Sequence, residues 1–174
     1  METTKNDLPP NIKKFFYNLS DFLDTKLLYY GSVQRSDYIP GKSDIDIDIF
    51  TDNEHSIISK MQHFLGCPKS DFKSIVWIIN DVPAHGYKLM YKNPEENIVA
   101  EFSIYNDKFK DMIIKEHTKK FVLPFYITII LYIVKFFYYT VPILPKKTYI
   151  EIKRWLLSRG IGEDLDKFIV LDSF

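Results

Sequence analysis

The stretch that decides the fold is residues 29–50, which read YYGSVQRSDYIPGKSDIDIDIF. It opens as the end of an apolar strand, breaks at Gly31-Ser32 and continues through a polar loop. Carboxylates then alternate with isoleucines. This alternation predicts a half-buried strand, because successive side chains of a strand point to opposite faces of the sheet. The isoleucines should face a core, and the other face should carry Asp44, Asp46 and Asp48.

Three like charges in a row on one strand face are costly unless water or a cation screens them. One interpretation is therefore a solvated sheet face. The turn at Gly31-Ser32 favours a second one, because glycine lets backbone approach a ligand closely and the serine hydroxyl and N–H can bind phosphate. Phosphate donors beside paired carboxylates are what a Mg²⁺–nucleotide complex requires.

The combination of Gly31-Ser32, Arg35 and the Ser-Asp-Ile-Asp of residues 43–46 resembles the signature of the polymerase-β-like nucleotidyltransferase superfamily. The small stand-alone (minimal) type is most similar, although the loop here is about one residue longer, which loops tolerate. The resemblance covers residues 27–50 and extends over residues 10–105. It implies an α/β (α+β) fold, in which a mixed-sheet core is flanked by helices and a C-terminal helical extension packs on it.

The resemblance also implies roles for individual residues. Gly31 and Ser32 would cradle the terminal phosphates of an NTP. Asp44 and Asp46 would bind two divalent ions per site, Mg²⁺ or Mn²⁺. The family's third carboxylate comes from a neighbouring strand further along the chain.

Glu101 is the candidate for that third carboxylate. It is the single carboxylate of the strand expected at residues 98–105, in the setting where the family usually has aspartate. A neighbouring strand lies about 4.8 Å away, so Glu101 could reach metals held by Asp44 and Asp46. In the family this carboxylate binds the catalytic metal and can accept the proton of the attacking hydroxyl. An exposed strand glutamate is the alternative interpretation.

Asp48 is expected to be a peripheral or solvated carboxylate. Alternate strand residues are about 6.7 Å apart, which separates Asp44 and Asp48 by about 13 Å. Two catalytic metals lie only about 3.5–4 Å apart. One strand therefore cannot supply three ligands to one site.

Further candidates are less specific. Arg35, Lys42 and Ser43 are candidate nucleotide-binding residues, since Arg35 and Lys42 flank the phosphate loop and could neutralise the nucleotide's charge. Either could equally be a solvated loop residue. Lys88 could face the site from a strand.

The four histidines show no metal-ligand spacing. His55 and His63 are expected on a helix surface. His85-Gly86 is expected in a turn, where it could touch the base or the acceptor. His117 has no assigned role.

Composition predicts one compact domain. Aromatic side chains make up 16% of the 174 residues, which is ample material for a core. Cys67 is the single cysteine, so neither an internal disulfide nor a cysteine metal cluster is expected. The first ten residues are polar and lack the apolar core of a signal peptide, so we expect a cytoplasmic protein.

The net charge is zero, but the charges are unevenly distributed. Residues 108–174 carry 12 Lys and Arg against 7 Asp and Glu, whereas residues 1–107 carry 11 against 16. An acidic half and a basic half could together hold a metal–nucleotide complex and an anionic acceptor or surface. Ordinary scatter is the alternative.

Periodicity and capping residues predict a helix from Pro9-Pro10 to about Asp24, and another from Asp52 or Asn53 to Gly66. Strands are expected at about residues 26–30, 44–50, 74–80, 87–92 and 98–105, and a hairpin-like connection at residues 93–97 joins the last two. Residues 1–107 should form the nucleotidyltransferase core. Residues 108–174 should form a helical extension of the same compact unit.

Residues 121–144 are almost entirely apolar and are comparable in length to the roughly 20 residues that span a bilayer. Lys135 lies in the middle, where a charge costs about 2.5–3.5 kcal/mol on insertion scales. Three interpretations stay open: a core helix packed on the sheet, which we favour, a membrane-surface contact, and a transmembrane span. An amphipathic helix should follow and end at Gly160, and the tail to Phe174 should be a short docking segment.

These patterns together predict a metal-dependent nucleotidyltransferase that moves an NMP from an NTP, ATP by default, to an acceptor hydroxyl and releases pyrophosphate. The acceptor, whether a protein hydroxyl, an RNA end, a small molecule or a second nucleotide, cannot be read from the sequence. The alternative is a nucleotide-binding pseudoenzyme or partner-binding module with the same fold, which could be membrane-associated.

Overall fold

The protein is described by a computed structural model over residues 1–141, 143–161 and 167–171. Its centre is a mixed sheet of six strands in the order β1-β2-β5-β4-β3-β6. β2 and β5 run parallel, and the other four neighbouring pairs are antiparallel. The strands are β1 Leu28–Tyr30, β2 Ile45–Thr51, β3 Lys73–Ile79, β4 Val82–Asn93, β5 Ile98–Asn106 and β6 Lys167–Val170.

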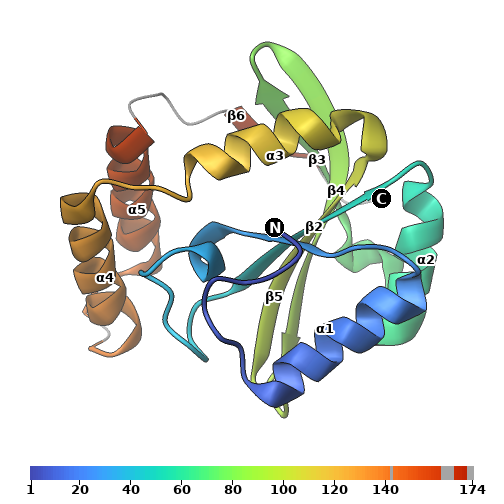
Figure 1. The fold of residues 1–174 in the computed structure, drawn as a ribbon, viewed down its shortest axis with the longest axis horizontal. Helices are drawn as coiled ribbons and strands as arrows, with labels where there is room; N and C mark the ends of the chain where they lie inside the picture. Colours follow the sequence, from blue (N-terminus) through green and yellow to red (C-terminus); the bar gives the residue numbers. More distant parts are fainter. Residues whose placement is uncertain (142, 162–166, 172–174) are drawn as a thin grey trace.

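The sheet is flanked by α-helices, so the predicted α+β arrangement around a mixed sheet is confirmed (Figure 1). The α-helices of the described residues are α1 Pro10–Leu23, α2 Glu54–Leu65, α3 Lys110–Lys119, α4 Phe125–Tyr139 and α5 Lys146–Ile161.

α1 and α2 begin and end close to where the sequence predicts. α1 starts at Pro10, whose fixed φ suits a first helical turn, and is followed by Asp24 with a left-handed φ of 52°. The Asn53 side chain accepts a hydrogen bond of 3.0 Å from the Ser56 N–H and so caps α2. Gly66 ends α2 with a φ of 66°, a conformation that favours glycine.

The alternation along β2 separates two environments, as predicted. Ile45, Ile47 and Ile49 are buried in one hydrophobic cluster with the apolar rows of α1 and α2. On the opposite face of β2, Phe50 packs in a second cluster with Ile113 of α3. The carboxylates of β2 therefore lie on the face that α3 partly covers.

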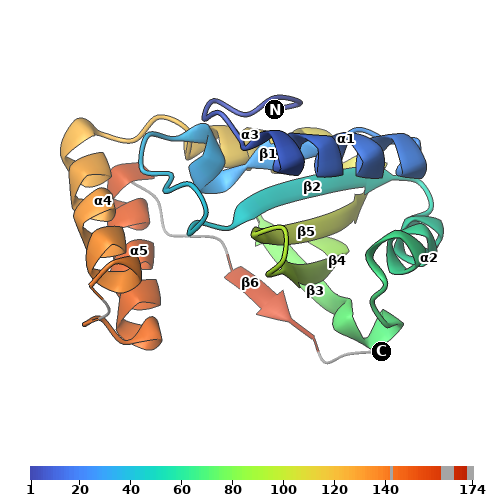
Figure 2. The same cartoon turned by 90° about the horizontal axis from the view of Figure 1, so that it is seen from below.

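α4 and α5 stand side by side beyond one end of the sheet (Figures 1 and 2). Ile127 and Leu131 of α4 pack with Leu156 of α5. The opposite row of α4 is apolar and exposed: Phe125, Tyr126, Ile129, Ile130, Tyr132, Ile133, Phe136 and Phe137. The favoured interpretation of residues 121–144 as a core helix packed on the sheet is wrong in its packing partner, because the buried apolar row of α4 packs on α5. Among the described helices, none has both the length and the apolar character to cross a bilayer.

The structure differs from expectation at the far edge of the sheet. β4 begins at Val82, so His85-Gly86 lies within a strand, and the prediction of a turn there is wrong. The chain reverses earlier, at Asn80-Asp81, where positive φ values of 47° and 62° build a two-residue hairpin turn. Part of the tail docks as predicted, but it does so as the strand β6, which pairs antiparallel with β3. Residues 162–166 and 172–174 of the tail lie outside the described residues.

Candidate active site

The Gly31-Ser32 turn touches the carboxylate strand. β1 pairs antiparallel with β2, and Tyr30 lies opposite Asp46. Gly31 follows with a φ of +69° and opens the short 3-10 turn Gly31–Gln34. A Cβ added to Gly31 would lie 1.8 Å from Asp46 Oδ2, so both the backbone conformation and the available space demand glycine. The two halves of the sequence motif are therefore in contact.

Ser32 carries a polar group that lacks a partner. The residue is only 3% exposed, and no described residue forms a hydrogen bond with its Oγ. A buried hydroxyl in this state is unfavourable by about 1–3 kcal/mol. An acceptor such as a phosphate oxygen beside Gly31 would relieve this cost, which fits the predicted role of the turn.

The predicted carboxylates influence one another electrostatically. Asp46 and Glu101 lie opposite each other in the parallel β2–β5 ladder. Burial raises the pKa of Asp46 well above its usual value, and the negative charges of Asp44 and Glu101 raise it further. Hard oxygen donors that repel one another fit a divalent cation.

Glu101 has a counterion in the protein itself. Its Oε1 lies 2.6 Å from Lys88 Nζ, so Lys88 faces this site from β4. Within the described ranges, no three His, Cys, Asp or Glu side chains come close enough together to hold a metal ion. Asp44 and Asp46 are hard oxygen donors of the type that a divalent ion prefers, and Glu101 is held by Lys88 instead of joining them.

Asp48 is fully buried, and the prediction of a solvated carboxylate is wrong. Its Oδ2 lies 2.9 Å from His117 Nε2 on α3, at an ion-pair distance without the geometry of a hydrogen bond. The His117 ring stacks on Tyr30 with the ring centroids 3.8 Å apart. Burial raises the pKa of Asp48, and the charge of His117 opposes this rise. Asp48 is therefore a structural partner of α3, because the helix covers this end of β2.

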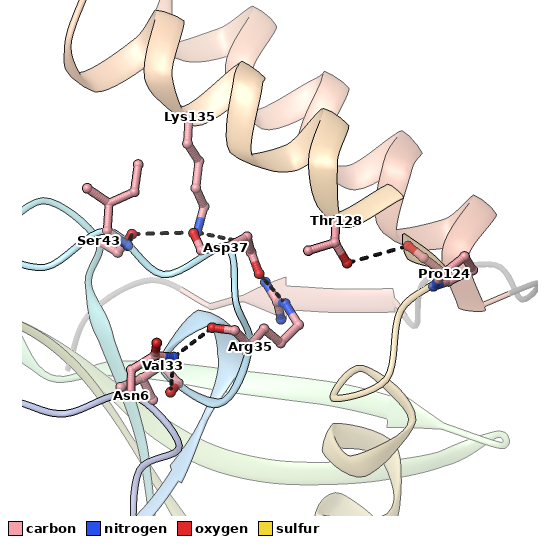
Figure 3. Close-up of polar contacts among 9 residues, drawn as sticks. Asn6, Val33, Arg35, Asp37, Ser43, Pro124, Thr128 and Lys135 are labelled. Atoms are coloured by element: carbon pink, nitrogen blue, oxygen red, sulfur yellow. Dashed lines mark hydrogen bonds and ion pairs between the residues drawn. The ribbon is translucent and has the colours of Figure 1, made fainter. Parts of the chain in front are cut away.

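A buried ion-pair network holds the loop between the Gly-Ser turn and β2 (Figure 3). Arg35 donates to the Asp37 carboxylate from Nε at 2.8 Å and from Nη2 at 3.2 Å. Lys135 of α4 lies 2.8 Å from the same carboxylate and donates to the Asp37 carbonyl oxygen, also at 2.8 Å. Burial alone would raise the pKa of Asp37, but Arg35 and Lys135 outweigh it and hold the pKa below its usual value. The network ties α4 to the motif loop.

Sequence reasoning misses Asp37 and its pairing with Lys135. A signal was present, since a lone lysine in an apolar helix needs a buried acidic partner if the helix packs against the protein. The identity of the partner depends on a contact across 98 positions of the chain.

The three less specific nucleotide-binding candidates make contacts within the loop or with α4. Arg35 is only 5% exposed, which rules out a solvated loop residue. Ser43 is also buried, and its Oγ accepts a hydrogen bond of 3.1 Å from a backbone N–H of the loop. The exposed Lys42 donates from Nζ to the Tyr139 carbonyl at 3.3 Å and to the Thr140 hydroxyl at 3.1 Å. These bonds shape the loop and attach it to α4.

An open pocket of about 600 Å³ adjoins Asp44. β4 and β5 contribute one side of it, and α4 and α5 contribute the other. Its cationic lining residues are Lys42, Lys92, Lys146, Lys153 and Arg154. Lys153 also lowers the pKa of Asp46, against the larger effects that raise it. The basic excess of residues 108–174 is thus partly gathered beside the carboxylates, which sequence reasoning could not place.

None of the four histidines lines this pocket. His55 and His63 are exposed on α2, as predicted, and His85 is exposed on β4. His117 is buried against Asp48.

Comparison with known proteins supports the family resemblance. A family model described as a nucleotidyltransferase domain matches residues 10–161. This range includes the Gly-Ser turn, the carboxylate strand, Glu101 and the helices α4 and α5. No curated protein and no solved structure matches the chain significantly.

Proposed function

The chain belongs to the nucleotidyltransferase domain family, and from this premise we propose that it is a metal-dependent transferase. It moves an NMP from an NTP, with ATP as the default donor, to an acceptor hydroxyl and releases pyrophosphate.

The contact between Gly31 and Asp46 carries this proposal. A side chain at Gly31 would collide with the Asp46 carboxylate, so the turn suited to phosphate and the strand suited to metal meet at one place. The buried Ser32 hydroxyl, which has no hydrogen-bond partner among the described residues, supports a phosphate at this turn.

In the proposed reaction the groups of the chain bind and orient the substrates. The Gly31 N–H and the Ser32 hydroxyl donate hydrogen bonds to the terminal phosphates. Asp44 and Asp46 would hold divalent ions, which the family generally uses and which we propose to be Mg²⁺ or Mn²⁺. When bound, these ions neutralise phosphate charge and stabilise the departing pyrophosphate.

Glu101 is proposed to accept the proton of the attacking hydroxyl. Its position opposite Asp46 supports this role. Its ion pair with Lys88 means that the carboxylate must turn away from Lys88 Nζ when the acceptor binds.

Transfer of label from α-phosphate-labelled NTPs tests the proposal. The purified protein is incubated with Mg²⁺ or Mn²⁺, each of the four NTPs in turn, and a cell lysate as the acceptor pool. We expect label on an acceptor with the wild type and none with Asp44→Asn/Asp46→Asn. Asp52→Asn, which changes an exposed carboxylate just after β2, is the matched control and should remain active.

Thermal unfolding of all variants separates loss of chemistry from loss of fold. Full activity of the Asp44→Asn/Asp46→Asn variant would show that the proposed mechanism is wrong. A wild type that binds Mg²⁺–NTP but labels no acceptor would instead be a nucleotide-binding pseudoenzyme.

A further inference from the structure

The pocket beside Asp44 is strongly cationic. Its five lysine and arginine side chains come from the motif loop, from β4 and from α5, so the fold gathers them from distant parts of the chain. Among the described lining residues Asp44 is the one carboxylate. Such a field attracts anions and repels cations. A polycationic ligand is therefore disfavoured here, and a ligand that carries phosphate is favoured.

The same pocket presents aromatic surface. Tyr138 and Tyr149 stack with their ring centroids 4.1 Å apart and an angle of 3° between the ring planes. Tyr139 packs edge-on against Tyr149 at 5.9 Å. Tyr138 and Tyr139 remain partly exposed, and Met90 on the facing strand is 45% exposed. Aromatic side chains beside cations form the usual binding surface for a nucleobase and its backbone phosphates.

The pocket lies next to the reacting centre but apart from the phosphate turn. Asp44 lines it and also acts electrostatically on Asp46. Gly31 and Ser32, where the terminal phosphates of the NTP are proposed to bind, are not among its lining residues. A ligand in this pocket would thus approach the carboxylates from a side that the NTP phosphates leave open. A volume of about 600 Å³ lies within the range of about 300–1,000 Å³ that is typical of small-ligand pockets.

We infer that this pocket is the acceptor site and that the acceptor is a nucleoside phosphate, either free or as the terminal nucleotide of a nucleic-acid strand. The assignment of this ligand as the acceptor depends on the proposed function, whereas the chemical class of the ligand is inferred from the residues that line the pocket. The phosphates lie among the cations, the base lies against the tyrosines, and the hydroxyl faces Asp44 and Asp46.

The proposed transfer forms one bond to phosphorus and breaks another. The acceptor hydroxyl oxygen forms a bond to the α-phosphorus of the NTP, and the bond from that phosphorus to the oxygen bridging to the β-phosphate breaks. Pyrophosphate leaves with the electron pair. The hydroxyl proton passes to Glu101.

Binding measurements on the full chain test this inference without requiring turnover. The probes are a fluorescein-labelled single-stranded oligonucleotide of about five residues, AMP as competitor, and Mg²⁺–ATP measured separately. Lys92→Gln/Arg154→Gln removes one exposed cation from each side of the pocket. Lys14→Gln/Lys147→Gln removes two exposed lysines outside it and is the matched control.

We expect the pocket variant to weaken oligonucleotide binding about tenfold or more, and to reduce the slope of log K against log salt by about 0.7 for each cation removed. The control pair should stay within about twofold of the wild type, and Mg²⁺–ATP binding should be unchanged in both variants. Tighter binding of the oligonucleotide than of AMP assigns a strand end, and equal binding assigns a free nucleotide.

Three results would overturn the inference. The first is that the pocket variant loses oligonucleotide binding and Mg²⁺–ATP binding equally, which would assign the pocket to the NTP. The second is that the control pair loses as much oligonucleotide binding as the pocket variant. The third is that the wild type binds neither the oligonucleotide nor AMP. The proposed function is judged separately by label transfer with Asp44→Asn/Asp46→Asn, so either proposal can fail while the other stands.

Discussion

Asp37 and Asp46 lie on the same segment of chain in opposite electrostatic surroundings. Asp37 is buried between Arg35 and Lys135, and these partners hold its pKa below the usual value despite burial. Asp46 is half-buried, and burial together with two neighbouring carboxylates raises its pKa. The fold supplies counterions to the first and leaves the second among like charges. A carboxylate of the second kind is available to an added cation, whereas one of the first kind serves the structure.

Asp48 lies between these extremes and shows that burial alone does not distinguish them. It lies 2.9 Å from His117, yet its pKa is raised, because burial outweighs the opposing effects of His117, Lys88 and Lys120. The balance between burial and the hydrogen-bonded cations around a carboxylate therefore decides the direction of its pKa shift.

The largest expected effect is on the rate of transfer, and it follows from replacing Asp46. Asp46→Asn should lower transfer by about a thousandfold, about 4 kcal/mol in the barrier, because an amide is a poor ligand for a hard cation. The free energy of unfolding should stay the same or rise, because a repelled carboxylate has been removed. Label transfer and urea unfolding measure the two quantities. A loss of stability that matches the loss of activity would contradict this prediction.

The next largest effect is on stability, and it follows from removing Lys135, an ion-pair partner of Asp37. Lys135→Met should lower the free energy of unfolding by about 3 kcal/mol, because a buried carboxylate loses one of its two cations. The exposed Lys147→Met on α5 is the control and should change it by less than about 0.5 kcal/mol. Urea unfolding measures both. Equal stability of the two variants would show that the network does not anchor α4.

Acid should remove the Asp37 contribution. The pKa of Asp37 is lowered in the fold, so its ionised form stabilises the protein at pH values above the unfolded-state pKa of about 3.9. This stability is lost as the pH falls through the folded-state pKa. Urea unfolding from about pH 6 to about pH 2, without divalent ions, should show the gap between wild type and Asp37→Asn closing in acid. Lys135→Met offers the same comparison, and a gap independent of pH would contradict the assignment.

The smallest effect concerns Glu101. Unlike Asp46, Glu101 forms an ion pair among the described residues, and its partner is Lys88. Lys88→Met removes that counterion, so the Mg²⁺ concentration for half-maximal transfer should fall by about two- to fivefold. The pair is partly exposed, at 25% and 19% for the two side chains, so stability should change by less than about 1 kcal/mol. A Mg²⁺ titration of activity measures the effect, with the exposed Lys73→Met as control. A higher Mg²⁺ requirement would show that Lys88 assists the site in another way.

Local patterns in the sequence are enough for much of this protein. The strand that carries Asp44 and Asp46, the inward-facing isoleucines and the cap at Asn53 all follow from short-range spacing, whereas the mixed sheet is implied by the family resemblance. The role of Gly31 as a close-approach residue follows from its place at the end of a strand. Each of these local features depends on a few neighbouring residues, whose backbone preferences act before any tertiary contact forms.

Local sequence patterns do not identify the ion-pair partners of the carboxylates. Nothing near Asp37, Asp48 or Glu101 in the sequence identifies Lys135, His117 and Lys88 as their counterions. The site pocket has the same character, because its cations come from three separate parts of the chain.

The sequence by itself determined the family, the strand that holds the motif, and which residues we propose to touch phosphate and metal. Only the tertiary structure decided which carboxylates are neutralised, which remain among like charges, and where the basic half of the chain meets the acidic half. The physical reason is that electrostatic energy falls with distance in space and not with separation along the chain. Packing of α3 and α4 brings His117 to 2.9 Å from Asp48 and Lys135 to 2.8 Å from Asp37, whereas Asp46 lies opposite Glu101.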